Sequence, residues 1–140
     1  MWWFGHATIL DALPSIPNNN KEKLMKMSTI KIEFYVSRSK LMDNFMGCNW
    51  EQDPVAREFV CYYEYRDGDT RFPITYLNEE GTGEITRFID ADDIANALSS
   101  AICAGASHCG ERIGLEFDDW DACVGTAILQ FALYGGELYG

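Results

Sequence analysis

Apolar and polar residues alternate through the first half of the chain. The segment 28–37, STIKIEFYVS, places isoleucine, phenylalanine and valine at every second position, which is the period of a half-buried β-strand. Aromatic and β-branched residues, interrupted by glycine-containing turns, predict further strands over 57–66, 70–77 and 84–89. This half of the chain therefore predicts a small antiparallel meander.

Apolar residues follow helical spacing in the second half. Asp90 is expected to begin a helix that ends near Gly105, because an aspartate at the N-cap accepts hydrogen bonds from free amides. A second helix is predicted over 120–134, and it is apolar nearly all round, which is typical of a core helix or an oligomer interface. Two shorter elements are expected, a helix over 40–47 and a strand over 112–117.

These patterns predict one α+β domain over residues 28–140. Its small antiparallel sheet, of about four strands, is expected to pack against the two C-terminal helices. Pro73 lies inside the strand 70–77 and has no N–H to donate, so we expect that strand at an edge or beside a bulge. A chain of 140 residues is long enough to bury a core.

Residues 1–27 differ in pattern from the remainder, and we interpret them as an N-terminal extension. Two prolines and an asparagine run interrupt any long helix, while the apolar residues near the start are costly to leave in water. The extension packs on the domain, packs on a partner, or is disordered. An alternative is that it is not native: Lys21-Glu22 can be encoded by a bacterial ribosome-binding sequence, which would place the natural start at Met25 or Met27.

Charge narrows the choice of partners. The chain has 22 acidic residues against 11 lysines and arginines, for a formal net charge of −11. Phosphate and anionic lipid repel such a chain, so direct binding to nucleic acid or to a membrane is disfavoured. We recognise no signal peptide and no apolar stretch of the roughly 20 residues that a membrane helix needs. The five cysteines are odd in number, which favours reduced thiols in a cytoplasmic protein.

The acidic residues gather at the predicted starts of the two C-terminal helices. Carboxylates at a helix start cap free amides and complement the helix dipole, which gives them a structural role. The alternative is a negative surface that binds what nucleic acid binds, a positively charged groove on another protein. The residues of this candidate partner-binding site are Asp90, Asp92, Asp93, Glu116, Asp118, Asp119 and Asp121.

No group of residues marks a reaction. The zinc candidates Cys103, His108, Cys109 and Cys123 match no common ligand spacing, and the acidic clusters lack the glycine of a calcium loop. His108 and Cys109 are adjacent, but in an extended segment their side chains would point to opposite faces. We therefore predict no catalytic residue, no metal and no cofactor, although a carboxylate pair for glycoside hydrolysis remains an unmarked alternative.

In size, acidity and lack of catalytic motifs, the chain resembles the small proteins that phages and mobile elements use against bacterial defences, such as anti-CRISPR proteins and DNA mimics. The resemblance is one of composition. It implies a non-catalytic inhibitor in the cytoplasm of a bacterial host, which binds a nucleic-acid-binding defence complex by occupying its basic surface. The alternatives are a homo-oligomeric structural or accessory protein that associates through helix 120–134, and a small-ligand-binding domain or enzyme.

Overall fold

The computed structural model describes residues 2–8, 31–116 and 120–140 of the chain. The described residues contain both strands and helices, and the two longest helices lie in the C-terminal half of the chain. The fold is α+β, as the hydrophobic pattern predicts, but the strands form separate sheets instead of one.

A three-stranded antiparallel sheet covers one side of the core, in the order β3 (Val60–Tyr63), β4 (Arg71–Leu77) and β5 (Glu84–Asp90). Every second residue of β4 is buried, as a one-sided sheet requires. β4 and β5 agree with the prediction, whereas β3 is shorter than the predicted strand 57–66. Residues Ala56–Phe59 form α3 instead, a helical turn that buries its first and last residues and exposes the two charged residues between them.

Pro73 lies in β4, the central strand of this sheet, so the edge position, one of the two that were predicted, is wrong. The other, a bulge, is present in the neighbouring strand, because the pairing of β3 with β4 shifts register between Val60 and Tyr62. The Pro73 carbonyl accepts a hydrogen bond from Glu64 N at 3.2 Å. Because the N–H and C=O of a strand residue point to the same side, the missing donor of Pro73 faces the residues just beyond the end of β3. The sheet therefore loses one hydrogen bond at the end of a ladder, where proline is tolerated.

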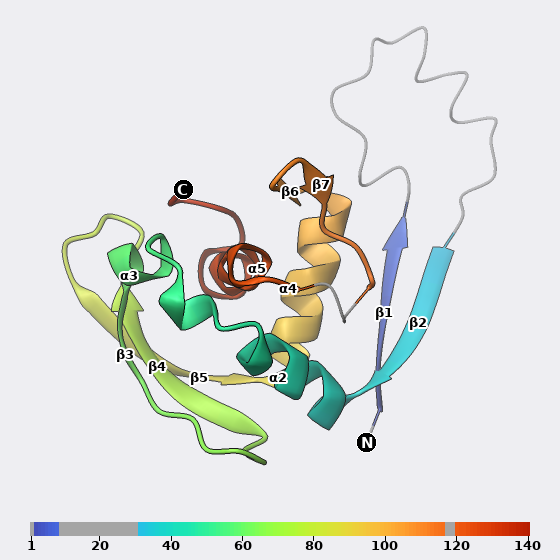
Figure 1. The fold of residues 1–140 in the computed structure, drawn as a ribbon, viewed down its shortest axis with the longest axis horizontal. Helices are drawn as coiled ribbons and strands as arrows, with labels where there is room; N and C mark the ends of the chain where they lie inside the picture. The colour runs from blue at the N-terminus through green and yellow to red at the C-terminus, as the bar shows by residue number, and fades with distance from the viewer. Residues whose placement is uncertain (1, 9–30, 117–119) are drawn as a thin grey trace, which may run out of the picture.

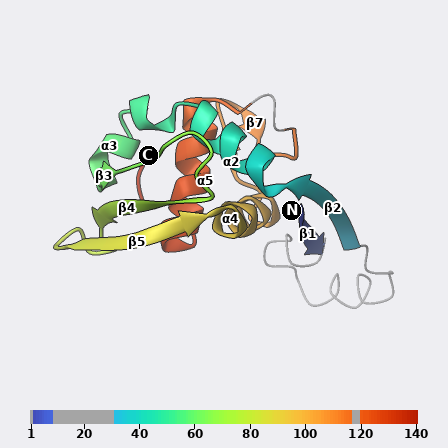
Figure 2. The same cartoon turned by 90° about the horizontal axis from the view of Figure 1, so that it is seen from below.

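A second sheet lies on the far side of the domain. β2 (Lys31–Ser37) occupies most of the strand predicted over 28–37, and it pairs with β1 (Trp2–Thr8) over seven antiparallel residue pairs. β1 also packs against α4 (Ala91–Cys103), which separates this hairpin from the three-stranded sheet (Figures 1 and 2). The predicted extension 1–27 thus contributes a strand to the fold of this chain, while residues 1 and 9–27 lie outside the described part.

A small hairpin follows α4. It consists of β6 (Ser107–His108) and β7 (Glu111–Arg112). The strand predicted over 112–117 is therefore wrong, since only its first residue belongs to a strand and residue 117 lies outside the described part. The alternating apolar residues do not share one buried face: Ile113 is buried in the core, whereas Leu115 is exposed.

The helices enclose the core from the other sides. α2 (Arg38–Gly47) follows β2 and leads through η1 (Trp50–Gln52) to α3, and α5 (Ala122–Tyr134) is the last element. Figure 1 shows α5 nearly end-on and α4 lengthwise, while Figure 2 shows the reverse, so the two helices cross steeply where they pack.

α5 is a core helix of this chain. Residues 125–130 are all buried, and the helix packs against α4 and η1. Gly125 makes the close approach of η1 possible, because a Cβ there would collide with Cys48 Sγ and lie 3.0 Å from the Trp50 Cβ. Helix 120–134 was predicted to be a core helix or an oligomer interface. The buried residues of α5 give it the role of a core helix. In the described part of the chain, no helix is both long and apolar enough to span a membrane.

Candidate functional site

The first acidic cluster, Asp90, Asp92 and Asp93, lies at the start of α4 and caps this helix. Asp90 is the N-cap of α4, where its Oδ1 accepts a hydrogen bond from Asp93 N at 2.9 Å. Asp93 Oδ2 in turn accepts from Asp90 N at 3.0 Å, which completes a capping box and satisfies two backbone donors. Burial raises the pKa of the Asp93 carboxyl above its ordinary value.

Arginines compensate the charge of this cluster. Arg38 pairs with Asp92 at 2.8 Å, and Arg87 pairs with Asp93 at 3.4 Å. Arg87 also donates to Ala132 O of α5 at 3.2 Å, so this ion pair ties the sheet to both C-terminal helices. The three predicted partner-binding residues at the start of α4 are thus all engaged within the chain.

The second acidic cluster is more open. Asp121 is the N-cap of α5, where its Oδ1 accepts a hydrogen bond from Val124 N at 2.9 Å. Asp121 is exposed to solvent. Glu116 is exposed in irregular structure before it. Asp118 and Asp119 lie outside the described residues. Because α4 and α5 cross steeply, their N-termini point in different directions, and the two predicted clusters are carried by differently oriented elements.

Sequence reasoning missed an acidic groove between α2, η1 and the chain that follows β3. Three carboxylates from separate segments line this space of about 410 Å³, Asp43, Glu51 and Asp67, together with Tyr63 and Tyr65. No lysine or arginine is among its lining residues. Burial raises the pKa of the Tyr65 hydroxyl, and the carboxylates of Asp43, Asp67 and Asp69 raise it further, as a negative local potential requires.

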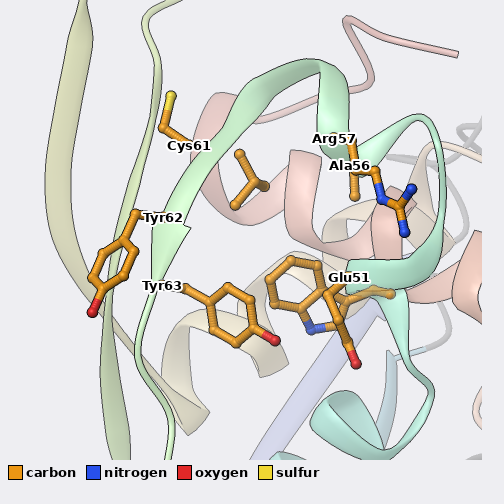
Figure 3. Close-up of a pocket in the computed structure, with 8 residues that line it drawn as sticks. Glu51, Ala56, Arg57, Cys61, Tyr62 and Tyr63 are labelled. Atoms are coloured by element: carbon orange, nitrogen blue, oxygen red, sulfur yellow. The ribbon is translucent and has the colours of Figure 1, made fainter.

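A smaller pocket of about 260 Å³ lies between β3 and η1 (Figure 3). Tyr63 and Glu51 lie together at one end of it, and Cys61 lies toward the other. The Trp50 indole packs against Tyr63 with ring centroids 4.9 Å apart, and its buried Nε1 has no hydrogen-bond partner among the described residues. Trp50 is fully buried, so it belongs to the core and not to a surface.

The most closely organised polar group is a cluster that we call the thiol centre: His108, Cys109, Cys123 and Glu137. The His108 Nδ1 lies 2.7 Å from Cys123 Sγ, and the His108 Nε2 lies 2.9 Å from Glu137 Oε1. Cys109 Sγ lies 3.9 Å from Cys123 Sγ. When the imidazole proton is on Nε2, the ring donates to Glu137 and accepts from the Cys123 thiol.

Local structure explains how each member of the thiol centre is placed. His108 ends β6, and the following turn has positive φ at Cys109 (54°) and Gly110 (81°), the signs that a type I′ hairpin turn requires. A positive φ is uncommon for cysteine. Cys123 is the second residue of α5, after the Asp121 cap. These contacts bring together the hairpin, the start of a core helix and the C-terminal tail.

Buried Gln130 holds that tail. Its Oε1 accepts from Leu138 N and Tyr139 N, both at 2.8 Å, and its Nε2 donates to Tyr139 O at 3.0 Å. The Tyr139 ring then stacks on Phe59 with centroids 5.1 Å apart. Glu137 lies directly before this anchored segment, so Gln130 positions the carboxylate that reaches His108.

The thiol centre opens onto a pocket of about 430 Å³. His108 and Cys123 line it, together with Gln52, Asp53, Pro54, Val55, Ala122, Thr126, Gln130, Tyr139 and Gly140. Burial raises the pKa of the Cys123 thiol to about 12, and the neighbouring Cys109 thiol raises it as well, followed by the carboxylates of Asp121 and Asp53. Cys123 is therefore protonated near neutral pH and can donate to His108.

The thiol centre was not predicted from the sequence. His108 and Cys109 were expected to point apart in an extended segment, but Cys109 lies in a turn, and both reach Cys123. Of the four zinc candidates, Cys103 is outside the cluster, and the described residues contain no group of three or more ligands arranged to hold a metal ion. The one usable signal was a cysteine directly after the acidic cluster at a predicted helix start.

Comparison with known proteins gives no match: no family model fits the sequence, and neither a curated protein nor a solved structure is similar to it. The function is therefore proposed from the geometry of these sites.

Proposed function

We propose that this chain is a small acidic binding protein that inhibits a nucleic-acid-binding bacterial defence complex by occupying its basic surface. The observation that carries the proposal is uncompensated surface charge. Among the described residues, exposed aspartates and glutamates outnumber exposed lysines and arginines by more than two to one. A surface of this sign attracts the positively charged grooves that hold nucleic acid, and it requires no catalysis.

Two areas are the strongest candidates for the contact. The first is the exposed part of the predicted site, Glu116 and Asp121, which borders Asp118 and Asp119 in sequence. The second is the acidic groove, whose concave shape suits an arginine or lysine side chain of a partner. Asp90, Asp92 and Asp93 contribute less to this proposal, because capping and arginine pairs already use them.

Capture from bacterial lysate, followed by binding measurements at several salt concentrations, tests this proposal. The variants are Glu116→Lys/Asp121→Lys at the helix start and Asp43→Lys/Asp67→Lys in the groove. We expect at least one pair to weaken binding more than tenfold, and the affinity to fall steeply with salt. Glu79→Lys/Glu80→Lys changes the charge equally in the exposed turn between β4 and β5 and serves as the control.

Two results would contradict it: affinity that is independent of salt, or equal weakening by all three charge-reversed pairs. The first would indicate an apolar contact. The second would indicate that only the net charge matters.

Self-association is the second candidate, and one observation favours it. The outward face of the three-stranded sheet carries exposed apolar rings, with Tyr62 at 57% and Phe88 at 52% exposure, and Figure 1 shows the helices on the opposite side of this sheet. Helix 120–134 is less suited to the interface, because its central residues are buried by the chain itself. Sedimentation velocity of the full chain and of Phe88→Ser across a concentration series tests this; a constant monomer in the unchanged chain excludes it.

A further inference from the structure

The thiol centre has the three groups that nucleophilic catalysis requires, joined by two contacts. A nucleophile, Cys123, lies within hydrogen-bond reach of a base, His108, and the base is oriented by a third group, Glu137. Triads are recognised by this geometry and not by residue order in the sequence. We propose that Cys123 is the nucleophile of an acyl-transfer site, that His108 is its general base, and that Glu137 orients His108. This proposal is independent of the binding function above.

The protonated state of Cys123 fits this role. A thiol with a raised pKa is a poor free nucleophile, so its attack depends on a base that takes the proton as the bond forms. His108 Nδ1 is the atom placed to do so, at 2.7 Å from the sulfur. The imidazolium that results is stabilised by Glu137 on the opposite nitrogen, since Oε1 lies 2.9 Å from Nε2.

The start of α5 supplies donors for the developing oxyanion. Asp121 engages the amides of Val124 and Gly125, through its side chain and its carbonyl respectively. The amides of Ala122 and Cys123 belong to the same first turn, where no acceptor exists within the helix. Both residues line the pocket, so these N–H groups and the helix dipole are available to a carbonyl oxygen that the sulfur attacks.

The pocket indicates the class of substrate. Its wall is formed largely by apolar groups, such as Pro54, Val55 and Ala122, which suit a small acyl group. Asp53 adds a carboxylate close enough to raise the pKa of Cys123, so an anionic substrate is repelled. The structure therefore points to neutral or cationic carboxylic esters or amides.

The reaction balances in two steps. The thiol proton moves to His108 Nδ1 as the Cys123 sulfur bonds to the acyl carbon, and the leaving alcohol or amine departs with a proton from the imidazolium. His108 then takes a proton from water as the water oxygen bonds to the thioester carbon, the C–S bond breaks, and the imidazolium returns the proton to the Cys123 sulfur. The products are a carboxylic acid and the free thiol, so ester or amide plus water gives acid plus alcohol or amine.

The test uses the full chain and p-nitrophenyl acetate as the probe. Stopped-flow absorbance should show a burst of p-nitrophenolate, and peptide mass spectrometry of the quenched reaction should find the acetyl group on Cys123. This mapping needs no variant, so it does not depend on how a substitution affects folding. Exposed Cys61, on β3, provides the control Cys61→Ser, which should retain the burst.

Two variants separate catalysis from structure. Cys123→Ala should lose the burst, and His108→Ala should slow acylation about 10²- to 10⁴-fold. In His108→Ala the residual rate depends on ionisation of the thiol alone, so its pH profile should move toward alkaline pH.

Glu137 is a positioning residue, and it has its own readout. Glu137→Gln keeps an oxygen that can accept from His108 Nε2, whereas Glu137→Ala removes the partner. We expect Glu137→Ala to slow acylation more than tenfold. Glu137→Gln should slow it less, because its amide oxygen still orients His108 but carries no charge to stabilise the imidazolium. The proposal is overturned if acetyl maps to other cysteines and not to Cys123, if Cys123→Ala keeps the burst, or if His108→Ala leaves rate and pH profile unchanged.

Discussion

At the scale of single residues, the buried thiol of Cys48 makes the stability of the fold depend on pH in the alkaline range. Its Sγ donates to Phe45 O at 2.9 Å, and burial raises its pKa from 9.0 to about 11. Because the folded pKa is the higher one, the unfolded chain loses this proton first as pH rises.

We expect the free energy of unfolding to fall between pH 9 and about 11, with Cys48 contributing about 2–3 kcal/mol of that loss. Urea denaturation over this range, compared with Cys48→Ala, measures the contribution. The variant should be less stable at pH 8 but should show a shallower decline. Parallel curves for the two proteins would show that Cys48 does not titrate as described.

Gly125 is a second residue whose role depends on its neighbours. A Cβ at this position collides with Cys48 Sγ. Overpacking of this kind costs about 1–3 kcal/mol, whereas alanine in place of glycine stabilises a helix by only ~1 kcal/mol. Gly125→Ala should therefore destabilise the protein. Gly47→Ala is the matched control in α2, because a Cβ there meets nothing within 4 Å. Equal or higher stability of Gly125→Ala in thermal denaturation would contradict the close packing of α5 on η1.

At the scale of elements, Gln130 connects α5 to the C-terminal tail. Removing its three hydrogen bonds in Gln130→Ala should lower the free energy of unfolding by about 1–3 kcal/mol and release the tail. Hydrogen exchange at Leu138 and Tyr139 should accelerate, since both amides lose their acceptor. Exposed Gln52→Ala is the control. Unchanged exchange at both amides would mean that the ring of Tyr139 alone holds the tail.

The elements that local chemistry determines were predictable. Asp90 and Asp121 are the caps of α4 and α5, and Gly135 ends α5 with a φ of 76°, as the residue types indicate. Elements set by distant contacts were not: β1 depends on pairing with β2, and Ala56–Phe59 turns helical because its two apolar ends face the core. The same limit hid the thiol centre, because His108, Cys123 and Glu137 meet only through the tertiary fold.

At the scale of the whole molecule, β1 bears on the extent of the domain. β2 pairs with no other described strand, so deletion of residues 1–27 leaves its ladder unpaired and uncovers the part of α4 against which β1 packs. We expect this deletion to lower the free energy of unfolding by at least ~2 kcal/mol and to promote self-association at the open edge.

Chemical denaturation and sedimentation of the truncated chain measure both effects. A truncated protein as stable and as monomeric as the full chain would support the interpretation that residues 1–27 are an extension outside the native domain.

The anchored C-terminal tail has a practical consequence for how this protein is handled. Gly140 lines the same pocket as Cys123, so a purification tag or a fluorescent protein fused after it would begin at the wall of that pocket. Such a fusion would crowd the space beside the thiol centre and pull on the residues that hold Glu137. A tag placed after Gly140 should therefore be cleaved without residual residues before binding or labelling assays.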